Sequence, residues 1–115
     1  MIGGIELGLL CLALNIWHEA RGSDVNAQLA VAHVTLNRAR LDALADGGHS
    51  KSSPPNICRV VYAPSQMSWT KLLVGTSRIP APNSVSWIKA QHLAQQALTS
   101  PDFTGGSLWY HRYDI

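Results

Sequence analysis

Apolar side chains recur along the first twenty residues at the spacing of an α-helix. One face of this stretch carries Ile5, Leu9, Leu12 and Ile16, at steps of three or four residues. Because such steps return to the same face of a helix, the pattern predicts a core-facing helix over residues 4–21. Gly22 is suited to the position just past its end.

Two later stretches show the same period. Residues 25–44 follow Ser23 and Asp24, either of which can cap a helix N-terminus. The first half of this stretch is apolar on most sides and is predicted to be central, whereas the second half is charged and more exposed. Residues 84–99 predict an amphipathic helix. Its apolar side consists of Trp87, Ala90, Leu93, Ala94 and Ala97.

The remaining segments are shorter and less regular. Residues 57–63 fit a short helix or a strand, and the short helix is favoured. Residues 104–115, "TGGSLWYHRYDI", predict a glycine turn followed by an aromatic strand. Gly, Pro and Ser predict loops over residues 45–56, 64–70 and 75–84. The expected fold is α+β and mostly α, with a small terminal strand element, in a single domain over residues 1–115.

Composition narrows the choice of partners. The chain has 115 residues, 46% of them hydrophobic and 14% charged, and a net charge of +2. This suits a compact domain, expected to be a monomer, and it lacks the basic face that binding of nucleic acid requires. The apolar run from Leu7 to Leu14 is far shorter than the roughly 20 residues of a membrane-spanning helix. No basic region precedes it and Glu6 interrupts it, so we expect a buried helix, no signal peptide and no stable membrane insertion.

The two cysteines allow at most one disulfide. Cys11 lies within the apolar run of the first predicted helix. A buried free thiol is therefore the favoured interpretation for Cys11, ahead of a disulfide with Cys58.

The stretch "WHEARG", residues 17–22, begins like the zinc-protease signature H-E-x-x-H. That signature needs a second histidine four residues after the first, and Gly22 stands there. The other histidines have no ligand spacing; they are His33, His49, His92 and His111. We therefore expect no metal and no cofactor.

Glu19 lies three residues after Ile16 and seven after Leu12, which places it on the core-facing stripe. Burial and the negative end of the helix dipole both raise the pKa of a carboxyl group, as a general acid requires. A structural ion pair with Arg38 or Arg40 is the alternative. The residues alone leave the two interpretations equally balanced.

Three blocks of the sequence together resemble a known family. They are "HEARGSDVNAQLAVAHVTLNRAR", "ICRVVYAPSQMSWT" and "TGGSLWYH", and they follow one another in order across residues 17–111. This arrangement resembles the cell-wall hydrolases related to the spore cortex-lytic enzymes SleB and CwlJ, a family also found in phage endolysins. Many relatives continue past the aromatic strand, so a truncation after Ile115 is left open.

The resemblance implies a lysozyme-like or lytic-transglycosylase-like fold, and peptidoglycan glycan strands as the partner. The bond is the β-1,4 link between N-acetylmuramic acid and N-acetylglucosamine, and Glu19 is implied as the catalytic acid. The other blocks imply further site residues. Substrate contacts are expected from Gln66, Ser68, Trp69, Tyr110 and His111. Supporting or structural roles are expected for Arg21, Asn37 and Arg38.

A lytic transglycosylase is favoured because no second carboxylate stands at an obvious spacing from Glu19. Asp24 is the nearest in sequence, and a helix cap is its simpler use. Such an enzyme uses the sugar's own C6 hydroxyl and leaves 1,6-anhydro-muramic ends. The alternatives are a hydrolytic muramidase, an N-acetylmuramoyl-L-alanine amidase, and a non-catalytic peptidoglycan-binding or virion structural domain. We expect an endolysin released from the host cytoplasm to the wall, or an enzyme of the cell wall or spore cortex.

Overall fold

The computed structural model describes residues 4–45, 56–62 and 80–108 of the 115-residue chain. The described part consists of four helices: α1 (Gly4–Ala20), α2 (Val25–Ala45), α3 (Ile57–Val61) and α4 (Val85–Thr99). The described residues contain no strand, which confirms the mostly helical prediction. The predicted terminal strand falls on residues 109–115, outside the described residues.

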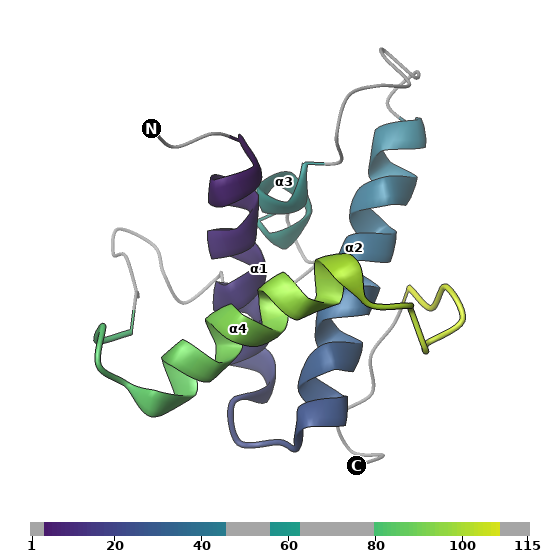
Figure 1. Cartoon of the computed structure of the whole chain (residues 1–115). Coiled ribbons are helices and arrows are strands. Elements are labelled where there is room, and N and C mark those ends of the chain that lie inside the picture. Colours follow the sequence, from purple (N-terminus) through teal and green to yellow (C-terminus); the bar gives the residue numbers. More distant parts are fainter. Residues whose placement is uncertain (1–3, 46–55, 63–79, 109–115) are drawn as a thin grey trace.

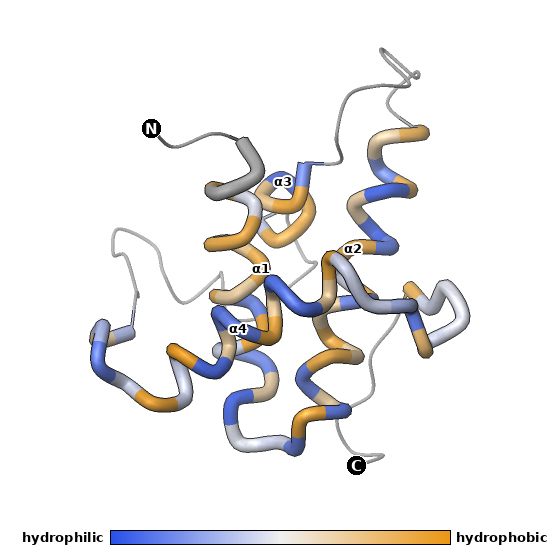
Figure 2. The backbone as a smooth tube through the Cα atoms, viewed as in Figure 1, coloured by the Kyte–Doolittle hydropathy of each residue, from blue (hydrophilic) through white to orange (hydrophobic). Residues whose placement is uncertain are grey.

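α1 is the central helix of the described part (Figure 1). It runs antiparallel to α2, α4 crosses in front of both, and α3 packs against the first half of α1. Residues 11–16 of α1 are buried without interruption. The prediction of one core-facing stripe was therefore too narrow, because α1 packs against three helices and is apolar along most of its length (Figure 2).

A polar pair lies inside this apolar interface. The Asn15 side chain of α1 donates a hydrogen bond of 2.9 Å to the hydroxyl of Thr35 on α2. That hydroxyl donates in turn to the Val31 carbonyl at 2.7 Å. Buried polar groups are costly unless paired, so this pair fixes the register of α1 on α2.

The helix boundaries follow from capping residues that the sequence contains. Asp24 accepts a 2.8 Å hydrogen bond from the Ala27 amide, which confirms it as a cap of α2. The Ser84 hydroxyl accepts from the Trp87 amide at the start of α4. The buried face of α4 is the predicted one: Trp87, Ala90, Leu93, Ala94 and Ala97.

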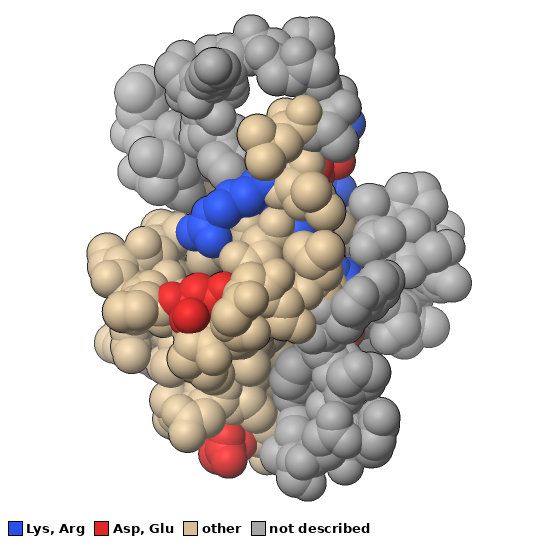
Figure 3. All heavy atoms as spheres, turned by 90° about the vertical axis from the view of Figure 1, so that its right-hand side faces the viewer, with Lys and Arg blue, Asp and Glu red and all other residues tan. Residues whose placement is uncertain are grey.

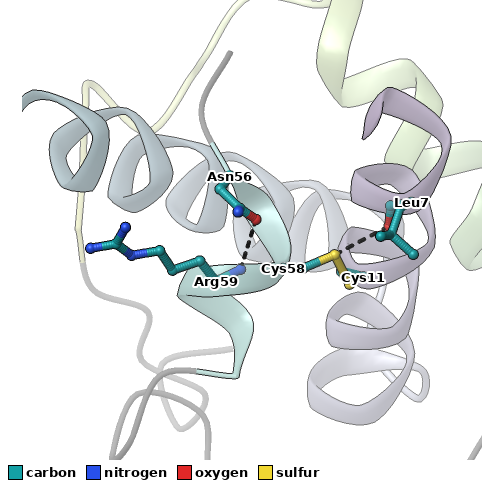
Figure 4. The surroundings of a disulfide bond; sticks show 5 residues. All are labelled: Leu7, Cys11, Asn56, Cys58 and Arg59. Carbon is teal, nitrogen blue, oxygen red and sulfur yellow. Dashed lines mark hydrogen bonds between the residues drawn. A yellow bond between two sulfur atoms is a disulfide. The ribbon is translucent and has the colours of Figure 1, made fainter. Parts of the chain in front are cut away.

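The prediction of a free thiol at Cys11 was wrong. Cys11 forms a disulfide with Cys58, with their Cα atoms 5.2 Å apart, and this bond joins α1 to α3 (Figure 4). Cys11 is buried, as expected, but the face of α1 that carries it is the one on which α3 packs. The short helix predicted over residues 57–63 is confirmed as α3.

Candidate functional site

Glu19 occupies the next-to-last position of α1 and is half-buried. The helix closes just after it, where the Ser23 amide donates to the Ala20 carbonyl at 2.9 Å. The exposed Gly22 follows, as the sequence pattern predicted. The carboxylate therefore lies at the edge of the core, beside the turn that joins α1 to α2.

The end of α1 has two chemically distinct sides, and one of them faces α4. The Trp17 indole N–H donates a 2.9 Å hydrogen bond to the Ser86 hydroxyl. The Arg21 guanidinium lies 4.1 Å from the centre of the Trp17 ring and donates to the Trp17 carbonyl at 3.3 Å. This cation–π contact places Arg21 on the α4 side. Glu19 is two residues from both and points to another side of the helix.

The second side of the α1 end faces Arg38 of α2. Burial lowers the pKa of the Arg38 guanidinium, and the negative charge of Glu19 acts in the opposite direction. Arg38 therefore lies within the electrostatic reach of Glu19. Arg40, the other cation considered as a partner, donates instead to the Asn37 side-chain oxygen at 3.0 Å.

Arg38 also connects this side to the residues after α4. Its Nε donates a 2.6 Å hydrogen bond to the Leu108 carbonyl. Its neighbour Asn37 donates from its amide nitrogen to Asp102 Oδ2 at 2.9 Å and to the Ser107 carbonyl at 3.1 Å. Asn37 and Arg38 thus tie two points of α2 to a segment about 65–70 residues further along the chain.

We call residues 100–108 the anchor segment. Its organising group is the Asp102 carboxylate, which accepts from the amides of Thr104 at 2.8 Å and Gly106 at 3.0 Å. Gly105 and Gly106 have φ values of 70° and 83°, a conformation that glycine adopts without strain. The hydrogen bonds from Thr104 and Asn37 hold the pKa of Asp102 well below its ordinary range, so the carboxylate is charged at neutral pH.

A buried histidine stands beside the anchor segment. His33 of α2 is 2% exposed, and its Nδ1 lies 4.0 Å from Asp102 Oδ1. Its Nε2 is 3.4 Å from the Ser100 hydroxyl, and its ring meets Phe103 edge-on at 5.8 Å between centres. No pattern in the sequence had indicated a role for His33 or Asp102. The run Asp-Phe-Thr-Gly-Gly at residues 102–106 contains a turn signal that was available in the sequence.

Three aspartates of the described residues have structural uses. Asp24 caps α2, Asp42 pairs with Arg59 at 3.1 Å, and Asp102 organises the anchor segment. Within the described part, no group of three His, Cys, Asp or Glu residues is arranged to hold a metal ion. The described helices also include none with the length and hydropathy of a membrane span.

The predicted substrate contacts cannot be placed with Glu19. Gln66, Ser68, Trp69, Tyr110 and His111 lie outside the described residues. Of the predicted supporting residues, Asn37 and Arg38 lie on the α2 side, whereas Arg21 lies with Trp17 on the other side. The α2 side is therefore the one that joins Glu19 to the anchor segment, which leads directly into Tyr110 and His111.

The surface charge agrees with the small net charge. On the face drawn in Figure 3, the described residues carry basic and acidic side chains in separate small groups, with no continuous basic surface among them. This distribution gives no support to binding of nucleic acid through phosphate contacts.

Comparison with known protein families matches residues 22–115 to the family described as Cell Wall Hydrolase. The match covers most of the chain and includes α2, α3, α4 and the anchor segment. It begins three residues after Glu19, so it carries no information on that residue. Searches of curated proteins and of solved structures find no match to this chain. The chain belongs to the cell wall hydrolase family, the family of the SleB type, whose members degrade peptidoglycan.

Proposed function

We propose that this hydrolase cleaves the β-1,4 glycosidic bond between N-acetylmuramic acid and N-acetylglucosamine, with Glu19 as the proton donor. The observation that supports Glu19 is its half-buried position at the edge of the core. The nearby Arg38 charge favours the ionised form of Glu19, the form that is left after proton transfer. By contrast, a helix cap, a surface ion pair and a turn anchor are the uses of Asp24, Asp42 and Asp102. The resemblance to SleB and CwlJ supports a lysozyme-like fold for the whole domain.

The proposed reaction is that of a lytic transglycosylase. Glu19 gives its proton to the glycosidic oxygen as the bond from the muramic C1 to that oxygen breaks. The C6 hydroxyl of the same muramic residue attacks C1, and its proton returns to the Glu19 carboxylate. The product has a 1,6-anhydro ring and no water is consumed. An intramolecular hydroxyl has the advantage of proximity over free water.

Arg38 has a defined part in this scheme. Its positive charge stabilises the carboxylate that remains after Glu19 has given up its proton. The same charge would also suit a purely structural ion pair. The two interpretations differ in what loss of the Glu19 charge does to activity and to stability.

Gln66, Ser68, Trp69, Tyr110 and His111 are proposed as substrate contacts, and Arg21 as a support on the α4 side. Amide, hydroxyl and aromatic groups are the kinds of side chain that bind sugar hydroxyls and ring faces. In the cell, the proposed role is that of a phage endolysin or of a spore cortex-lytic enzyme.

The proposal is tested by Glu19→Gln, with Glu6→Gln as the matched control on the same helix. Purified variants are assayed on isolated peptidoglycan, and their thermal unfolding midpoints are measured. We expect Glu19→Gln to lose at least about 100-fold in rate, because a positioned proton donor contributes 10²–10⁴-fold. Its midpoint should stay close to that of the parent.

Two outcomes would reject this role. Residual activity above about a tenth of the parent means that another group is the acid. A large fall in the midpoint, with activity lost only because the protein unfolds, means that Glu19 and Arg38 form a structural pair. A free amino group appearing at the alanine end of the peptide, with glycan strands left intact, would instead identify an amidase.

A further inference from the structure

The anchor segment is held by one face of α2, and the order of contacts is the same along both elements. His33 contacts Ser100, Asp102 and Phe103. One turn further along α2, Asn37 contacts Asp102 and Ser107. The next residue, Arg38, binds the Leu108 carbonyl. The segment is therefore fixed at successive points along its length.

Polar bonds, rather than burial of apolar surface, hold this segment. Phe103, its largest apolar side chain, is 57% exposed, and both glycines are exposed. The Asp102 side chain is only 22% exposed and accepts hydrogen bonds from Thr104, Gly106 and Asn37. Hydrogen bonds to charged groups are the stronger ones and are directional, so they define the path of the backbone.

That path ends at Arg38, which interacts electrostatically with the proposed acid. Leu108 is bound by Arg38, whose guanidinium lies within the electrostatic reach of Glu19. Trp109, Tyr110 and His111 follow Leu108 directly in the sequence. Leu108 therefore immediately precedes, in the sequence, the stretch that carries two of the proposed substrate contacts.

We infer that Asn37 and Asp102 are positioning residues of the proposed reaction, which fix the backbone at Ser107 and Leu108 next to the Arg38 side of Glu19. This inference rests on the proposed function. Neither residue touches the sugar. They act by setting where the chain enters the site, and a displacement of about 1 Å in such a frame can cost about 100-fold in rate.

The test exchanges the two groups of the Asn37–Asp102 contact. Asn37→Asp places two carboxylates against each other, and Asp102→Asn turns an amide toward the backbone N–H donors of Thr104 and Gly106. The double variant Asn37→Asp/Asp102→Asn again sets one carboxylate against one amide. Asp42→Asn is the matched control, because it removes an acidic group of α2 that pairs with Arg59 away from the anchor segment.

We measure kcat and KM on soluble glycan strands, at a temperature at which circular dichroism shows every variant fully folded. Each single variant should lose at least about tenfold in kcat. The double variant should also stay below the parent, because a carboxylate at position 37 cannot donate to the Ser107 carbonyl. Asp42→Asn should retain the parent's kcat. Loss of stability alone cannot produce this pattern, because all the molecules assayed are folded.

Folded single variants with a kcat within twofold of the parent would overturn the inference. A double variant with the kcat of the parent would do the same, because it lacks the donor to the Ser107 carbonyl. Glu19→Gln is assayed in the same series, so the two proposals fail separately. Full activity in Glu19→Gln rejects the proposed acid, whereas full activity in the two single variants rejects only the positioning role.

Discussion

α3 and the anchor segment are both attached to the α1–α2 pair, but by different chemistry. α3 is joined to α1 by the Cys11–Cys58 disulfide, whereas the anchor segment is joined to α2 by hydrogen bonds centred on Asp102. Each attachment precedes a stretch with proposed substrate contacts, residues 66–69 after α3 and residues 110–111 after the anchor segment. A reductant should therefore loosen the first attachment, and acid the second.

α3 needs its attachment because it is too short to be stable alone. A helix of five residues does not recover the cost of its own nucleation. Its buried residues are Val60 and Val61, and the Asn56 side chain caps its first turn by accepting from the Arg59 amide at 3.0 Å. Figure 4 shows the Arg59 side chain pointing away from the disulfide. The ion pair of Arg59 with Asp42 and the Cys11–Cys58 disulfide therefore lie on opposite sides of α3.

The largest expected effect is loss of the disulfide. The bond joins residues 47 apart in the sequence, and chain entropy predicts about 4 kcal/mol of stabilisation for such a loop. Cys11→Ala/Cys58→Ala, or the parent in excess dithiothreitol, should unfold about 10–20 °C lower. Thermal unfolding followed by circular dichroism measures this difference. An equal midpoint with and without reductant would show that the disulfide does not form in solution.

The next effect is the acid sensitivity of the anchor segment. The pKa of Asp102 is lowered in the folded protein, so its contribution is complete above the unfolded pKa, near 4. The contribution is lost as pH falls below 4 toward the folded value. Asp102→Asn should cost about 2 kcal/mol or more at pH 7, because hydrogen bonds to a charged group contribute about 1.5–3 kcal/mol each.

This cost should shrink as pH is lowered from 5 to 2, because the unfolded parent takes up a proton at Asp102 while the folded parent does not, which favours unfolding of the parent. Urea titrations of both proteins at each pH measure the difference. A cost that does not change with pH would mean that the charge of Asp102 has no part in holding the segment. Reductant should not alter this cost, because the disulfide lies at the other attachment.

The smallest effect concerns the second contact of α3. Arg59 and Asp42 pair at 3.1 Å, with side chains that are 51% and 35% exposed. Exposed ion pairs contribute about 0–1 kcal/mol. Arg59→Ala should therefore shift the unfolding midpoint by no more than about 4 °C. A loss as large as that of the disulfide variant would show that charge, rather than the covalent bond, holds α3.

The helices could be predicted because their signals are local. The spacing of Trp87, Ala90, Leu93, Ala94 and Ala97 was enough to identify the buried face of α4. Asp24 and Ser84 marked helix starts by the hydrogen bonds that they offer to backbone amides. The disulfide could not be predicted, because it depends on which face of α1 receives α3, and no local pattern encodes that packing.

The candidate site likewise has features that local sequence signals predict and features that depend on distant contacts. The position of Glu19 at the edge of the core followed from the helical wheel. The contact of Asn37 with Asp102 spans 65 residues and joins a helix to a loop. No periodic pattern in the sequence could therefore predict it. The sequence left Arg38 and Arg40 as equal partners for Glu19. The structure distinguishes the two arginines: Arg40 donates a hydrogen bond to Asn37, whereas Arg38 interacts electrostatically with Glu19.

The central claim, that Glu19 cleaves the glycan without a second carboxylate, is tested most directly by the mass of the products. Peptidoglycan is digested with the parent chain, and the released muropeptides are separated and weighed without prior reduction. We expect 1,6-anhydro-muramic ends, each lighter by one water than the product of a hydrolytic muramidase. A hydrolase would need a second carboxylate within about 5–9.5 Å of the first. Muramic acid with a free reducing end as the main product would contradict the account.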